Sequence, residues 1–196
     1  MDFREILGVL SKSSPYAVTT AGEIIDPELR QIKDNLYIET DVELAFKEKV
    51  ASISPHEIIF LCGSSGDGKS EILTRYSTLH RNNVDFHFDA THSFDPEATA
   101  VETLDAVISK WKNEGRPLVV GINIGMLANY EQDGSIEHAD VKLAINKFLT
   151  DRSATKKITF IDFESFPKFK FESGRISSPF FSRLINKVVI DDQKNR

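Results

Sequence analysis

The sequence predicts an α/β fold of three layers, in which helices cover both faces of a mainly parallel sheet. Short apolar runs bounded by turn residues predict buried strands, and segments with apolar residues at helical spacing lie between them. Strand and helix patterns alternate along the chain, as they do in βαβ units. The run over residues 118–123 is almost continuously apolar, which is typical of a strand covered on both faces.

The predicted elements divide the chain into a helical N-terminal segment over residues 1–40 and one domain over 41–196. Apolar residues at helical spacing predict a short amphipathic helix over 1–12. In the domain, a capping box starting at Thr40 opens a helix that ends before Pro55. Four strands are predicted at 57–62, 84–89, 118–123 and 157–164. Further helices are predicted at 71–80, 97–113 and 137–149, with a loop at 131–135 and a last helix opened by Ser178 and Pro179.

Composition indicates a globular protein. The chain has 196 residues, of which 40% are hydrophobic and 28% charged, which suits one domain or one domain with an appendage. No apolar run approaches the length of a membrane span, and the N-terminus is too acidic for a signal peptide. We therefore expect a cytoplasmic protein with no membrane partner. The net charge of −6 argues against strong nucleic-acid binding by this chain alone, because such binding rests on neutralising phosphates.

The sequence Gly-Ser-Ser-Gly-Asp-Gly-Lys-Ser at residues 63–70 lies between a predicted strand and a predicted helix. This is the G-x-x-x-x-G-K-S pattern of a phosphate-binding loop in the context that the motif requires. Its glycines let backbone N–H groups and the positive end of the helix approach a polyphosphate. Lys69 would reach the β- and γ-phosphates, and the hydroxyl of Ser70 would coordinate Mg²⁺. The predicted cofactors are ATP and Mg²⁺, and the predicted cofactor-binding residues are Gly63, Ser64, Ser65, Gly66, Asp67, Gly68, Lys69, Ser70 and Glu71.

A phosphate-binding loop needs an acid for the metal and a group that orients water. One candidate is Asp162 at the end of the last predicted strand, with Glu164 polarising water from the same strand face. Asp89 at the end of the second strand is the other metal candidate, at a spacing similar to that of small-molecule kinases. Asn123 ends the third strand and resembles the polar sensor of AAA+ ATPases. Asp162, Glu164 and Asn123 are thus the candidate catalytic residues, and Ser70, Asp162 and Asp89 the candidate metal ligands.

Five stretches of the sequence carry a family resemblance, namely FREILGVLSKSSPYAV, GSSGDGKSE, FDATHSFDPEATAVETL, GINIGML and ITFIDFESFPKF. In these stretches the chain resembles the N-terminal part of the DptF family of DNA phosphorothioation-dependent restriction proteins. The resemblance implies a nucleotide-dependent component of a bacterial defence system that acts with other subunits of a restriction complex, and with DNA through that assembly, on DNA lacking a sulphur-modified backbone. No fifth strand or lid pattern follows, so we expect a domain that is incomplete at its C-terminus.

Three functions are therefore carried forward. The first is an AAA+-like P-loop ATPase whose ATP binding or hydrolysis changes how it engages its partners. The second is a small-molecule kinase, favoured by Asp89 but lacking an arginine-rich lid at residues 128–135. The third is an interaction module in which nucleotide is only a structural ligand.

Overall fold

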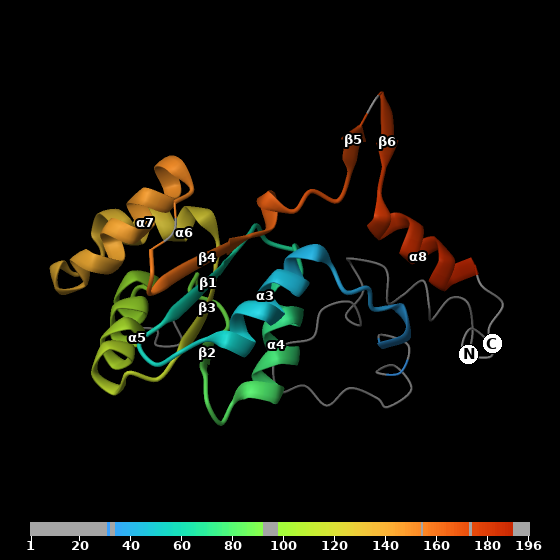
Figure 1. The fold of residues 1–196 in the computed structure, drawn as a ribbon. Coiled ribbons are helices and arrows are strands. Elements are labelled where there is room, and N and C mark those ends of the chain that lie inside the picture. The colour runs from blue at the N-terminus through green and yellow to red at the C-terminus, as the bar shows by residue number, and fades with distance from the viewer. Residues whose placement is uncertain (1–30, 32–33, 92–97, 154, 173, 190–196) are drawn as a thin grey trace. The chain divides into compact units, whose positions relative to one another are not determined.

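The computed structural model describes residues 31, 34–91, 98–153, 155–172 and 174–189 (Figure 1). The chain divides into two compact units. The central unit is Asp41–Phe166, and the terminal unit combines Met1–Thr40 with Pro167–Arg196. The predicted division into segments 1–40 and 41–196 stays a prediction. The helix predicted over 1–12 lies outside the described residues.

The central unit is an α/β structure around a four-stranded, wholly parallel sheet of order β2-β3-β1-β4. The predicted α/β class and parallel sheet are confirmed. Its strands are β1 (Ile58–Cys62), β2 (Asp85–His87), β3 (Leu118–Ile122) and β4 (Ile158–Asp162). Its helices are α3 (Asp41–Ser52), α4 (Lys69–His80), α5 (Ala100–Glu114), α6 (Ile124–Asp133) and α7 (Ala139–Asp151), with short 3-10 turns at Ile136–His138 and Phe163–Ser165.

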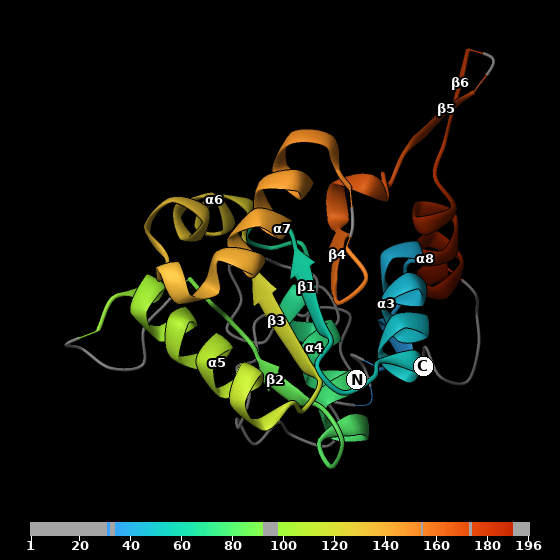
Figure 2. The same cartoon turned by 60° about the vertical axis from the view of Figure 1, so that its left-hand side comes forward.

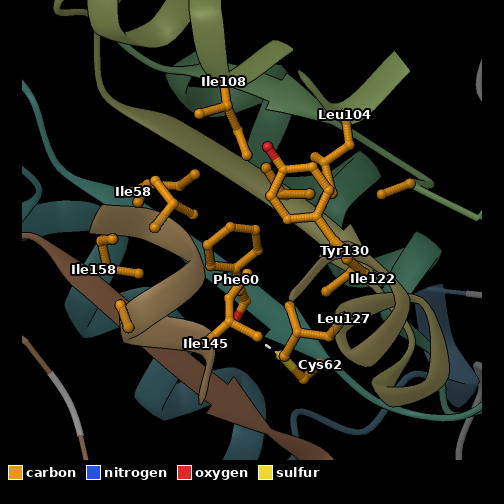
Figure 3. Close-up of a cluster of buried hydrophobic side chains, with 14 of the residues drawn as sticks. Ile58, Phe60, Cys62, Leu104, Ile108, Ile122, Leu127, Tyr130, Ile145 and Ile158 are labelled. Carbon is orange, nitrogen blue, oxygen red and sulfur yellow. Dashed lines mark hydrogen bonds between the residues drawn. The ribbon is translucent and has the colours of Figure 1, made fainter. Parts of the chain in front are cut away.

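The two faces of the sheet carry different helices because successive side chains of a strand point to opposite sides. On β1, Ile58, Phe60 and Cys62 join one hydrophobic cluster with residues of α5, α6 and α7 (Figure 3). Ile59 and Leu61 join the other cluster, with α3 and α4. All five residues of β1 are buried, which agrees with the continuous apolar pattern expected of a strand covered on both faces. Figure 2 shows the same layering, with α5, α6 and α7 on one side of the sheet.

The strand order places a topological switch point between β1 and β3. These strands are neighbours, yet the chain leaves β1 towards α4 on one face and leaves β3 towards α6 on the other. Right-handed crossovers require this arrangement, because the chain runs from β1 to β2 in one direction across the sheet and returns in the other. In open α/β sheets, ligands bind beyond the carboxyl ends of the strands at such a point. The loop after β1 and residue Asn123 after β3 both lie there.

Two of the predicted segments differ from the observed ones. Helix α6 covers most of the predicted loop at 131–135, and its buried side chains are Met126, Leu127 and Tyr130. The predicted strand at 157–164 stops at Asp162, because the carboxylate of Asp162 accepts a hydrogen bond from the N–H of Glu164 (3.1 Å) and turns the chain into a 3-10 helix. The assumption that Asp162 and Glu164 share one strand face is therefore wrong.

The terminal unit contains a two-stranded hairpin, β5 (Lys170–Glu172) with β6 (Arg175–Ser177), and helix α8 (Pro179–Val189). The predicted start of the last helix is confirmed, since the Ser178 hydroxyl accepts the N–H of Phe181 at 3.2 Å. Lys187 of α8 donates to the carbonyls of Asn35 (2.9 Å) and Tyr37. None of the helices in the described ranges is long and apolar enough to cross a bilayer.

Candidate functional site

The glycine-rich loop runs from the carboxyl end of β1 to the first residue of α4. Gly66 and Gly68 have φ values of 84° and 100°, a region that costs residues with a side chain about 1–2 kcal/mol. At Gly63 the need for glycine is spatial, because a Cβ atom there would lie 2.8 Å from Asp67 Oδ2 and 2.9 Å from the ring of Phe163. The local backbone, as well as the sequence pattern, therefore requires glycine at these three positions.

The loop directs unpaired backbone donors beyond the sheet. Gly68 is the N-cap of α4 and has no side-chain oxygen to cap it. The first hydrogen bond of the helix runs from the N–H of Ile72 to the carbonyl of Gly68 (3.2 Å). Within the described ranges, no hydrogen bond uses the N–H groups of Lys69, Ser70 or Glu71. These donors and the positive end of the helix dipole can bind an anion.

One loop donor already has an anionic partner. The N–H of Ser64 donates to Oδ2 of Asp67 at 2.6 Å, and the N–H of Asp67 donates to the Ser64 carbonyl at 3.4 Å. On the other side, the N–H of Gly63 donates to the carbonyl of Ile122 at the end of β3 (3.2 Å). The loop is thus attached both to itself and to the neighbouring strand, which preorganises its backbone.

The ammonium group of Lys69 lies across the loop. It donates to the carbonyls of Gly63 (2.8 Å) and Ser64 (2.7 Å). Burial lowers the pKa of Lys69 below its ordinary value, while the charges of Asp67 and Asp89 act in the opposite direction. The lysine therefore lies in a partly desolvated position where its charge interacts strongly with an anion.

Asp89 and Asn123 follow neighbouring strands at this edge, but each also has a structural partner. Asp89 Oδ1 accepts hydrogen bonds from the N–H and the hydroxyl of Thr91 (2.8 and 2.5 Å). Asn123 is the N-cap of α6, and its Oδ1 accepts the N–H of Met126 at 2.6 Å. The side-chain amide of Asn123 can still donate beyond the sheet.

Asp162 is the last residue of β4, in register with Cys62 of β1. Its carboxylate is almost wholly buried, and Nη1 of Arg152 donates to its Oδ2 at 2.6 Å. Since the other oxygen accepts the N–H of Glu164, both carboxylate oxygens are occupied. Glu164 is 65% exposed and lies 3.7 Å from Nη2 of Arg152. A metal bound to Asp162 would add a second positive charge beside the guanidinium of Arg152, so metal binding competes with this ion pair.

The predicted site residues therefore fall into two groups. The nine loop residues, Asp89, Asn123 and Asp162 all lie at the carboxyl edge of the sheet. Glu164 lies beyond this edge in the 3-10 helix, exposed, and shares the guanidinium of Arg152 with Asp162. Sequence reasoning missed Arg152, which lies ten residues before its partner at the left-handed end of α7 (φ 57°), where no motif marks it. Among the described side chains, no three His, Cys, Asp or Glu residues form a metal-binding group.

The fold and the loop define a parallel α/β unit with a glycine-rich strand–loop–helix at its topological switch point. Comparison of the chain with protein-family models, with curated proteins and with solved structures finds no match in any of the three.

Proposed function

We propose that this chain binds the polyphosphate of ATP, with Mg²⁺, at the loop between β1 and α4, and that it acts as an AAA+-like P-loop component of a larger assembly. The observation that carries the proposal is the set of N–H groups at Lys69, Ser70 and Glu71, which have no partner in the described chain, at the start of α4 and at the switch point of the sheet. Lys69 supplies a positive charge to the same place.

The biological setting comes from the resemblance to the DptF family. We propose that the nucleotide controls how the chain engages other subunits of a DNA restriction complex dependent on phosphorothioation, with DNA contacted through that assembly. In this role hydrolysis would need a metal acid, and Asp162 and Asp89 are the candidates, because both follow strands at the carboxyl edge where the loop begins. Asn123 would contact the γ-phosphate or the attacking water with its side-chain amide.

The first experiment is calorimetric titration of ATP with Mg²⁺ into the full chain and into Lys69→Ala. We expect micromolar binding, about 8 kcal/mol, that is lost in the variant. Lys49→Ala is the matched control, because Lys49 is an exposed lysine in the last turn of α3 and should leave the affinity unchanged. No heat of binding in the parent chain, or equal losses in both variants, would contradict the proposal.

A second candidate function is a module that holds nucleotide without hydrolysing it. It is favoured by the pairing of both Asp162 oxygens, with Arg152 and with the Glu164 N–H, because a metal at this acid would compete with the charge of Arg152. Release of inorganic phosphate distinguishes the two. Turnover that is lost in Asp162→Asn but retained in Glu164→Gln supports an ATPase that uses Asp162. Tight nucleotide binding without phosphate release supports the module.

A further inference from the structure

A cavity of about 540 Å³ lies along β2, at the edge of the sheet. Its walls come from the second half of α4, including Thr78, with Arg81 directly after that helix, and from the second half of α5, including Val107 and Trp111. None of the loop residues 63–70 lines it. Figure 2 places α5 on one side of this edge strand and α4 on the other. The cavity is therefore separate from the candidate nucleotide site.

The backbone of β2 is available on the side of this cavity. The N–H of Asp85 donates to the carbonyl of Pro117 at 2.9 Å, so Asp85 bonds towards β3. Because the hydrogen-bonding groups of a strand alternate in direction, the N–H and carbonyl of Phe86 point away from β3. No other backbone partner meets them in the described ranges. All three residues of β2 are only half-buried, in contrast to the wholly buried β1 and β3.

The two walls differ in chemistry. On the α5 side the cavity is lined by the apolar side chains of Val107 and Trp111 and by Lys110 and Glu114, whose Nζ and Oε2 atoms lie 3.8 Å apart. The cations on this side are already paired. Arg116 Nε lies 2.9 Å from Asp85 Oδ1, and Lys110 Nζ lies 3.5 Å from Asp85 Oδ2. On the α4 side the wall is polar, and Arg81 at its end is exposed. Within the described part of the chain Arg81 forms no ion pair.

We propose that this cavity receives an extended segment of a partner protein, which adds to β2 as a fifth strand between α4 and α5. Main-chain groups of the segment pair with the outward N–H and carbonyl of Phe86, since an open sheet edge recognises any extended backbone. Because successive side chains of an extended segment point to opposite sides, they alternately face the α5 wall and the α4 wall of the cavity. Apolar residues pack on Val107 and Trp111, and acidic residues in between lie near Arg81.

The test uses the full chain and a peptide probe of about nine residues, acetylated and amidated at its ends, in which Glu and Val alternate. We expect binding with a dissociation constant on the order of 10–100 µM by fluorescence anisotropy, as for weak transient contacts. The same peptide with N-methyl groups on alternate amides retains every side chain but loses the main-chain donors. It should bind at least about tenfold more weakly, a loss of about 1.4 kcal/mol.

Variants at Phe86 separate the backbone from the side chain. Phe86→Pro removes the phenyl ring and an N–H that does not serve the pairing with β3, at a position where an edge strand tolerates proline, and it should abolish binding. Phe86→Ala loses the same side chain but retains the N–H, and it should bind within about threefold of the parent. Far-ultraviolet circular dichroism and the unfolding midpoint of both variants verify that they fold. Arg81→Glu should weaken this probe and favour one in which Lys replaces Glu.

Several outcomes would overturn the proposal. They are no binding of the probe to the parent chain, binding that persists in Phe86→Pro, and equal affinity for the N-methylated peptide. A concentration-dependent dimer in sedimentation that Phe86→Pro abolishes would make a second copy of the chain the occupant instead. The inference does not rest on nucleotide binding, so we expect Lys69→Ala to bind the peptide with the affinity of the parent chain.

Discussion

Loss of the Arg152 side chain should destabilise the central unit through the carboxylate that it leaves behind. Asp162 has a side chain that is 2% exposed, whereas that of Arg152 is 51% exposed, and the two atoms Nη1 and Oδ2 are 2.6 Å apart. Breaking a fully buried pair costs about 3–5 kcal/mol, and breaking an exposed pair costs about 0–1 kcal/mol. With one partner buried and the other half-exposed, we expect Arg152→Ala to lower the free energy of unfolding by about 1.5–3 kcal/mol.

A second substitution at the same position separates the charge from the backbone. Arg152 has φ 57° and lies 4.9 Å from the centroid of the Phe148 ring. Arg152→Gly loses the same ion pair and ring contact as Arg152→Ala, but glycine adopts this conformation without strain. It should therefore be about 1 kcal/mol more stable than Arg152→Ala.

Urea unfolding followed by fluorescence measures these differences, because Trp111 is the single tryptophan and is only 6% exposed. A double-mutant cycle with Asp162→Asn tests the cause, and the cost of Arg152→Ala should fall below about 1 kcal/mol in that background. Glu164→Gln is the control, since this exposed partner should cost less than about 0.5 kcal/mol. A cost of Arg152→Ala that is equally small, or unchanged by Asp162→Asn, would refute the reasoning.

Two further predictions concern β3 and β2. Gly121→Ala would place a Cβ atom 2.5 Å from the carbonyl oxygen of Phe88, so it should cost about 1–3 kcal/mol of unfolding free energy in urea. Gly125→Ala, whose Cβ would meet nothing closer than 3.5 Å, should be neutral or stabilising by up to about 1 kcal/mol, and equal losses in both would contradict this. Burial lowers the pKa of His87 below its ordinary value near 6.5, against the opposing charge of Asp89. As pH falls below about 6.5, His87 is therefore protonated in the unfolded chain before it is protonated in the folded one, which lowers the free energy of unfolding. Between pH 7.5 and 5.5 this free energy should fall more in the parent than in His87→Gln. Equal losses in the two proteins would exclude His87 as the cause.

Much of the fold could be predicted because local sequence patterns indicate its strands and helices. The apolar run before Gly63 predicted a buried strand, and β1 is buried throughout. The capping residue Ser178 with Pro179 predicted the start of α8. Helix α6 was missed because Gly125 and Asn129 dilute its helical pattern and it follows β3 directly at Asn123. Strands β5 and β6 have three residues each, too few for a periodic pattern.

The candidate site could be predicted in detail where its residues are contiguous, and elsewhere only as polar residues that follow parallel strands. The loop at 63–70 could be predicted from the spacing of its residues, since one short segment supplies its glycines, lysine and serine. The surroundings of Asp162 could not be predicted, because Arg152 comes from the end of another helix and has no spacing rule that links it to β4. The sequence predicted Asn123 to be a sensor, and the structure adds that its side-chain oxygen Oδ1 caps α6.

The sequence by itself thus determined the α/β class, the strand–loop–helix at residues 58–80 and the positive-φ glycines Gly66 and Gly68, because these depend on interactions between residues close in the chain. Only the tertiary structure decided the strand order, the switch point beside β1, the partner of Asp162 and the open edge of β2. The physical reason is that these depend on which distant strands pair and on which face each crossover passes, and pairing of parallel strands has no local signature.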